Sequence, residues 1–227
     1  MKISEKVRHA QVIKACRIVA LLFVCLAPAH GQRYEITPLV GGMFGGTIGL
    51  EQQGVHNFEA HVNDRLSFGI SGAVRFDSDD CRGCNLIGFR WMRQNTHLRL
   101  HQDPIAVTPF TVSPFHPSVT FDNFLTDFSR EWDLEKTPIL KPFLSVSLGA
   151  ARMSTPAAST TRFVFGIGTG VNVFPKPRWG FHVQVEYLPM VMHAELQRVV
   201  CGVNCIVALS GGIMNQFQVS IGPSFRF

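Results

Sequence analysis

The C-terminal stretch Asn215-Gln-Phe-Gln-Val-Ser-Ile-Gly-Pro-Ser-Phe-Arg-Phe227 alternates between polar and apolar side chains. Successive side chains of a β-strand point to opposite sides, so the alternation predicts a strand with two different faces. The apolar face carries Phe217, Val219, Ile221, Pro223, Phe225 and Phe227. The polar face carries Gln216, Gln218, Ser220, Gly222, Ser224 and Arg226. Such a strand is expected to separate an apolar environment from a polar one.

The same alternation recurs upstream in seven further segments: 33–44, 65–76, 85–98, 119–132, 140–151, 162–174 and 180–187. Short turns are expected at 77–84, 133–138 and 175–178. Longer connections are expected at 45–63, 100–117, 154–160 and 189–213. An even number of strands with alternating short and long connections predicts an all-β fold, an eight-stranded antiparallel up-and-down β-barrel.

The first 31 residues differ in kind from the rest. A basic start is followed by the apolar run 18–27, and the small residues Ala29 and Gly31 precede Gln32. This three-part plan predicts a signal peptide over residues 1–31, cleaved before Gln32. The apolar run is shorter than the roughly 20 residues that a spanning helix needs, which disfavours an N-terminal anchor. One domain is therefore expected over residues 32–227.

Removal of the signal changes the charge of the chain. Residues 1–31 hold five of the 21 Lys and Arg residues and one of the 16 Asp and Glu residues, which leaves a net charge of +1. The basic pI of about 9.1 therefore reflects the signal. The charge gives no reason to expect a nucleic-acid partner.

The predicted apolar faces are nearly free of charge, whereas the polar faces carry mainly Gly and Ser with a few charged residues. A surface that faces lipid must be nearly free of charge, because a Lys or Arg at the bilayer midplane costs roughly 2–4 kcal/mol. A closed barrel also pairs every backbone group within the membrane. A secreted soluble barrel with its apolar face inside is the alternative. The narrow lumen of eight strands suits small residues and paired charges, which favours a transmembrane barrel.

Charged and polar side chains on the predicted inner face are expected to form a lumen network. Its predicted members are Arg65, Arg75, Arg90, Asp127, Glu131, Lys141, Arg162, His182, Glu186 and Arg226, and Glu35 is expected to face inward with them. Buried charges persist when they are paired and hydrogen-bonded, so such pairing would plug the lumen. A narrow polar pore is the alternative. His182 is expected to belong to this network rather than to a metal site.

Four cysteines follow the signal, as the pairs Cys81 and Cys84, and Cys201 and Cys205. An even number of cysteines in an exported protein predicts disulfides, here one local clip in each pair. The two pairs are expected at opposite ends of the barrel, which disfavours a four-cysteine zinc site. Acidic neighbours of the first pair disfavour a redox-active thiol. The segment 199–207 is expected to form a hairpin tip. Its exposed edge and apolar side chains could accept a partner, and a clipped loop that only resists proteolysis is the alternative.

Several motifs are similar to those of a known family. These are Tyr34-Glu-Ile-Thr-Pro38 followed by Gly41-Gly and Phe44-Gly-Gly46, Arg93-Gln-Asn-Thr-His97, and the last strand from Gly211 to the terminal Phe. Through them the chain resembles the small bacterial outer-membrane β-barrel proteins of the OmpA/OmpX-like porin superfamily. The resemblance implies an integral outer-membrane protein without a cofactor and carries over no catalytic residue. The terminal aromatics Phe225 and Phe227 resemble the signal read by the barrel-assembly machinery.

Three classes of function remain open. The first is a non-enzymatic barrel with a structural or surface-interaction role through its outer loops. The second is a narrow pore for water or small solutes, and the third is an enzyme that modifies lipid A. An enzyme needs a nucleophile and a base within reach, and the sequence offers no such pairing on a lipid-facing strand. We expect the first class of function and a monomeric protein. Its expected partners are outer-membrane lipid, the barrel-assembly machinery and an extracellular partner at the 189–213 loop.

Overall fold

The computed structural model describes residues 34–52, 55–76, 83–101, 118–155, 159–192, 199–200, 206–209 and 212–227. Its regular elements are β1 (Tyr34–Phe44), β2 (Thr47–Gln52), β3 (Val55–Val62), β4 (Arg65–Arg75), β5 (Gly83–His101), β6 (Ser118–Trp132), β7 (Leu140–Ser154), β8 (Ser159–Lys176), β9 (Trp179–Met192), β10 (Val199–Val200), β11 (Ile206–Leu209) and β12 (Gly212–Arg226). Among these residues, no helix is long and apolar enough to cross a membrane.

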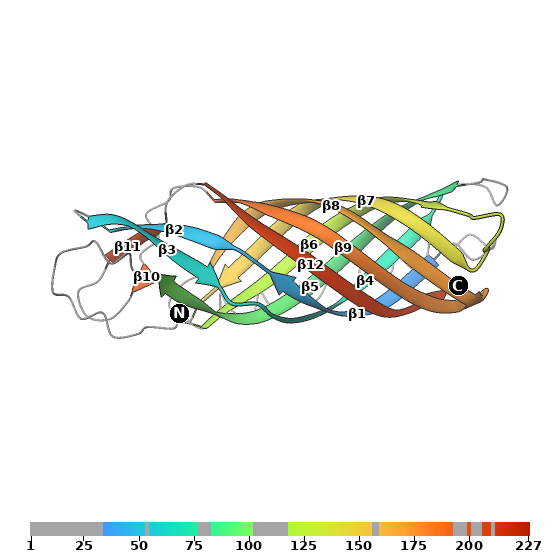
Figure 1. Cartoon of the computed structure of the whole chain (residues 1–227), viewed down its shortest axis with the longest axis horizontal. Helices are drawn as coiled ribbons and strands as arrows, with labels where there is room; N and C mark the ends of the chain where they lie inside the picture. The colour runs from blue at the N-terminus through green and yellow to red at the C-terminus, as the bar shows by residue number, and fades with distance from the viewer. Residues whose placement is uncertain are drawn as a thin grey trace, which may run out of the picture. The chain divides into compact units, whose positions relative to one another are not determined.

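Eight of these strands form a closed antiparallel ring, which Figure 1 shows from the side. Each strand pairs with the next one in the order β1, β4, β5, β6, β7, β8, β9 and β12. The seam between β12 and β1 closes the ring, for example through Phe225 opposite Ile36 and Ile221 opposite Val40. The predicted eight-stranded antiparallel barrel is confirmed, with all eight predicted strands in the ring.

Both ends of the ring are defined by the connections between strands. The Tyr34 nitrogen donates to the Phe227 oxygen at 3.2 Å, so the first and last described residues meet at one end. The turn of Pro177 and Arg178 between β8 and β9 lies at the same end. Short turns face the periplasm in bacterial outer-membrane barrels, so we call this the periplasmic end and the opposite one the outer end.

The strands that are not in the ring form a second structure, which we call the outer extension. It consists of β2, β3, β10 and β11, which lie together at the outer end (Figure 1). It begins at Gly45 and Gly46, whose positive φ angles of 76° and 108° are readily adopted by glycine and turn the chain out of β1. β3 then pairs with the outer end of β5, with Val62 opposite Leu98.

The outer extension lies within two of the predicted longer connections. The segment 45–63 contains the strand hairpin of β2 and β3. In the segment 189–213, β9 runs to Met192 and β12 begins at Gly212, and the predicted hairpin is confirmed as β10 paired with β11. The edge of β11 is not open for a partner, because it pairs with β2 from Val207 opposite Gln52 to Leu209 opposite Leu50.

Inner and outer faces of the ring follow the predicted alternation. The outer face exposes large apolar side chains all round, such as Phe68, Phe128, Leu148, Ile167 and Phe217, each more than two-fifths exposed. Except for Asp122 of β6, the buried polar and charged residues of the same strands point into the lumen. An exposed apolar band around a closed ring is the surface that lipid requires.

Candidate functional site

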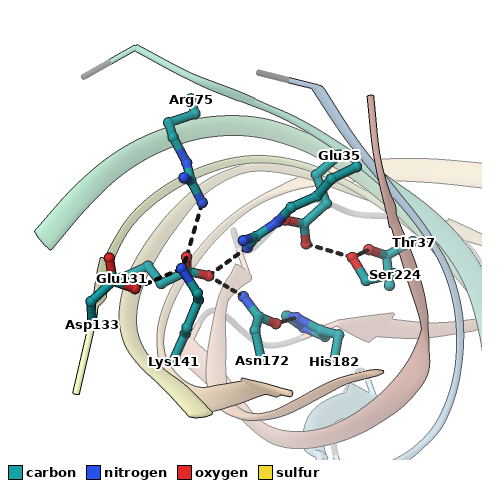
Figure 2. A network of polar contacts seen from close by, with 10 residues as sticks. Glu35, Thr37, Arg75, Glu131, Asp133, Lys141, Asn172, His182 and Ser224 are labelled. Carbon is teal, nitrogen blue, oxygen red and sulfur yellow. Dashed lines mark hydrogen bonds and ion pairs between the residues drawn. The ribbon is translucent and has the colours of Figure 1, made fainter. Parts of the chain in front are cut away.

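The lumen near the periplasmic end holds a charged network centred on Glu131 of β6, which is only 2% exposed (Figure 2). Arg75 Nη2 donates to Glu131 Oε1 at 3.0 Å, and Arg226 Nη2 donates to Oε2 at 2.7 Å. The Asn172 amide donates to Oε2 at 2.7 Å, and Lys141 Nζ lies 3.8 Å from Oε1. One carboxylate therefore joins side chains of four other strands.

Arg226 connects Glu131 to a second carboxylate. Its Nε donates to Glu35 Oε2 at 2.9 Å, and its guanidinium lies 3.5 Å from the centroid of the Phe174 ring. The other oxygen of Glu35 accepts from Ser224 Oγ at 2.7 Å, and Ser224 Oγ in turn accepts from Thr37 Oγ1 at 2.9 Å. These contacts link the first and last strands of the ring on its inner side, beside the seam.

A second cluster lies further along the lumen around Arg90 of β5, which is 1% exposed. Arg90 Nη2 is 3.1 Å from Asp127 Oδ1 and 2.5 Å from Glu186 Oε2, and Nη1 donates to Gln184 Oε1 at 2.9 Å. Ser147 Oγ donates to the other oxygen of Glu186. Arg90 therefore bridges the lumen from β5 to β6 and β9.

The two clusters are joined through His182. Its Nδ1 is 2.7 Å from Asn172 Oδ1, and its Nε2 is 3.3 Å from Gln184 Oε1. The ring stacks on Phe143 at a centroid distance of 5.0 Å. Gln184 also donates to Ser145 Oγ at 3.0 Å. The polar contacts thus run without a break from Glu35 at the periplasmic end to Glu186 near the middle of β9.

Charge in this network is balanced. Four cations, Arg75, Arg90, Lys141 and Arg226, are paired with four lumen carboxylates, Glu35, Asp127, Glu131 and Glu186. The balance meets the requirement that buried charges be paired and hydrogen-bonded.

Small residues on β8 make room for the network. A Cβ atom at Gly166 would lie 2.3 Å from Ser147 Oγ and 2.6 Å from Glu186 Oε1. At Gly168 it would lie 2.8 Å from Ser145 Oγ and 2.9 Å from Gln184 Nε2. The glycines on the inner face of this strand therefore let Gln184 and Glu186 fill the lumen.

The outer half of the lumen holds an apolar cluster, beside which the buried polar residues Gln94 and Asn123 also lie. Its buried cluster comprises Met43, Val62, Leu98, Val119, Phe121, Leu125, Ala151, Met153, Val164, Leu188, Met190, Met192 and Met214. Phe121, Leu125 and Met214 have no exposed surface at all. Sequence reasoning did not find this half, since it expected a lumen of small and polar residues throughout. The signal available to it was the set of methionines near the outer ends of the strands.

One small cavity of about 50 Å³ lies in the polar half among the described residues. Glu35, Glu131, Asn172, His182 and Gln184 contribute to its lining. The volume accommodates a few water molecules at most, since a single buried water occupies upward of roughly 10–15 Å³ on this measure. The cavity is too small for an organic ligand, whose sites usually have several hundred Å³.

One residue of the predicted lumen network lies outside the lumen, and a second faces the lumen as predicted but belongs to its outer half. Arg65 was expected in the lumen, but its side chain is exposed, because it is the first residue of β4 at the outer rim. Arg162 is buried on the inner face of β8, two residues from Val164 of the apolar cluster and toward the outer end.

The predicted disulfides stay predictions. Cys84 is buried on the inner face of β5, which begins at Gly83 within the predicted turn 77–84. Cys81, Cys201 and Cys205 lie outside the described residues.

Comparisons with known proteins identify the fold. No protein-family model matches the chain, and a search of curated protein sequences finds no match. Among solved structures, the outer-membrane protein OprG from Pseudomonas aeruginosa is similar with a TM-score of 0.59 and 7% identity, over 87% of this chain and 98% of that one. The outer-membrane protein AlkL is similar with a TM-score of 0.50 and 12% identity, over 88% and 93%.

Neisserial surface protein A is similar over 87% of this chain and 98% of that one, with a TM-score of 0.49 and 12% identity. At such low identities the likeness to OprG and AlkL speaks for the fold and not for a shared activity. The fold agrees with the apolar outer face, which only lipid covers favourably. The chain is therefore an integral β-barrel of the bacterial outer membrane, with the fold of that membrane's small barrel proteins.

Proposed function

We propose that the protein is a non-enzymatic, closed barrel that acts at the cell surface through its outer extension. The observation that carries the proposal is the filling of the lumen. The network from Glu35 to Glu186 occupies its periplasmic half, and the apolar cluster around Phe121 occupies its outer half. A lumen filled by side chains leaves the surfaces outside the ring as the place where a partner makes contact.

The outer extension has the features of a contact surface. Its strands continue the sheet beyond the ring, and they pair with one another in the order β10, β11, β2 and β3. Two edges lack a neighbouring strand among the described residues: β10, which pairs only with β11, and β3 from Val55 to Phe58, which pairs only with β2. An exposed strand edge offers backbone donors and acceptors to a partner strand.

The closed lumen predicts little or no conductance. The purified barrel in a planar lipid bilayer is expected to give no steady single-channel current, because the charged network fills the periplasmic half of its lumen and the apolar cluster fills the outer half. A narrow pore is the competing function, and the small cavity is the feature that favours it. Steady channels of reproducible conductance would establish the pore and refute the closed barrel.

Removal of β2 and β3 tests the surface role. A variant in which residues 47–61 are replaced by a short Gly- and Asn-containing turn should still close its ring, since the eight strand pairings that close it involve neither β2 nor β3, and β3 pairs with the ring only at the outer end of β5. Heat-modifiable migration on gels checks this closure. Cells that display the intact protein should capture an extracellular partner that cells with the variant do not capture. Equal binding by both kinds of cell would contradict a role for the extension.

A further inference from the structure

Three charged residues form a row across the outer face of the ring, where apolar residues prevail. Arg93 of β5 is the cross-strand neighbour of Asp122 of β6, and Asp122 is the neighbour of Arg152 of β7. Hydrogen bonds hold two of these residues, Arg93 and Asp122, in fixed positions. Arg93 Nε and Nη2 each donate to one oxygen of Asp122 at 2.8 Å, and the Trp91 indole donates to Asp122 Oδ1 at 3.2 Å.

The outward residues of the neighbouring cross-strand rows indicate the depth of these three charged residues in the membrane. One row closer to the periplasm, the outward residues of the same three strands are Trp91, Phe124 and Ala150. One row further out they are Asn95, Thr120 and Ser154, and Thr120 Oγ1 donates to Asn95 Oδ1 at 2.9 Å. The charged row therefore lies where the apolar surface ends and the polar surface begins.

The length of β7 supports this level. Its outward residues from Leu140 to Ala150 are uncharged, and Arg152 follows. Roughly ten steps of about 3.3 Å along a strand tilted by about 40° span about 25 Å of membrane height, the usual height of the apolar band. Arg152 is thus placed at the headgroup level of the outer leaflet.

The row also carries an unbalanced charge. Asp122 has a side chain only 9% exposed, and both its oxygens are engaged by Arg93. Arg152 is exposed, is the cross-strand neighbour of Asp122, and forms no ion pair with a carboxylate of the described residues. Two guanidinium groups and one carboxylate leave a net charge of +1 at a level where lipid phosphates lie.

We propose that this row is a binding site for a phosphate group of the outer-leaflet glycolipid, lipid A. Arg152 contacts the phosphate directly, with the planar, multidentate donors that suit phosphate oxygens. Asp122 and Trp91 hold Arg93 in a fixed orientation beside it, and the Arg93 guanidinium lies 5.8 Å from the Trp91 ring centroid. Trp91 and Phe124 supply the apolar surface on which the acyl chains of the same lipid pack.

The test measures capture of diphosphorylated lipid A by the folded barrel in phosphatidylcholine nanodiscs. Wild-type protein should bind it and should bind dephosphorylated lipid A weakly. Arg152→Gln should lower the affinity for diphosphorylated lipid A about fivefold, the size expected for one basic residue at an anionic surface. Arg152→Lys should keep most of the affinity. Heat-modifiable migration confirms that each variant is folded.

Arg130 gives the matched control, because it is an exposed arginine on the outward face of β6 near the periplasmic end. Arg130→Gln should leave the affinity unchanged. Equal losses for Arg130→Gln and Arg152→Gln, or equal binding of the two forms of lipid A, would overturn the proposal. Displacement of the lipid by inorganic phosphate at the same concentration would show a site for a free anion instead and would overturn it as well.

Discussion

Replacement of Glu131 by alanine is expected to lower the free energy of unfolding of the barrel by about 3–5 kcal/mol, the usual cost of removing one partner from a buried ion pair. The size of this loss follows from the number of side chains that contact the Glu131 carboxylate. Its two oxygens pair with Arg75, Arg226 and Lys141 and accept a hydrogen bond from Asn172. Without the carboxylate, Arg75 has no carboxylate partner among the described residues, while Arg226 keeps only Glu35 and Lys141 keeps only Asp133.

Unfolding by urea in detergent micelles, followed by tryptophan fluorescence, measures the loss. Asp133 supplies the matched control, because it pairs only with Lys141 among the described residues, at 2.6 Å, and is 45% exposed. Asp133→Ala should cost no more than about 1 kcal/mol, since exposed ion pairs contribute little. Equal stability of Glu131→Ala and wild-type protein would show that the network is not needed to hold the lumen together.

Changing Phe227 to aspartate is expected to remove most of the protein from the outer membrane of growing cells while leaving the folded barrel stable. The side chain of Phe227 is 64% exposed on the outside of the ring. Its backbone supplies the structural contacts, donating to the Tyr34 oxygen at 2.9 Å and accepting from the Tyr34 nitrogen at 3.2 Å. The substitution keeps these backbone contacts, so the expected defect lies in recognition during assembly.

Two measurements separate recognition from stability. Barrel refolded from urea into detergent should give similar midpoints for Phe227→Asp and wild type, whereas the fraction inserted in cells should differ. Phe76→Asp is the control, as Phe76 is 59% exposed just after β4 at the same end. Near the membrane interface a charged substitution costs only about 0–1 kcal/mol. If both variants are inserted equally badly, the effect arises from lipid contact and not from a terminal signal.

The sequence predicted the ring well because each strand carries lipid on one side and polar side chains on the other. That contrast produces the period-two pattern in β12 and in the periplasmic halves of the other strands. The alternation of polar and apolar residues is lost where inward residues pack in the apolar cluster of the lumen. In Leu188-Pro-Met-Val-Met192, apolar residues point both ways, so the alternation ends and the segment was expected to be a loop. The outer end of β9 could not be predicted, because its inward residues pack in an apolar part of the lumen that the sequence does not reveal.

Apart from Arg65, the sequence indicated which charged residues face the lumen, but it did not indicate which of them form ion pairs. Arg90 meets Glu186 across the lumen, although 95 residues separate them in the chain and their strands are not neighbours in the ring. Which charges meet depends on the stagger of all eight strands, and no local pattern contains that information. The row of Arg93, Asp122 and Arg152 escaped prediction for a related reason, because three separate strands must be in register before it exists.

The seam between β1 and β12 has a consequence for the order of folding. Seven of the eight pairings in the ring join strands nearby in the chain, and the turn of Pro177 and Arg178 brings β8 and β9 together at almost no loop cost. The seam instead pairs Glu35 with Arg226, at the two extremes of the domain. Contacts of such high sequence separation form late, so the barrel is expected to grow as a curling sheet of hairpins. Its two terminal strands would then be the last to meet, and a chain cut short before β12 would be left with an open edge.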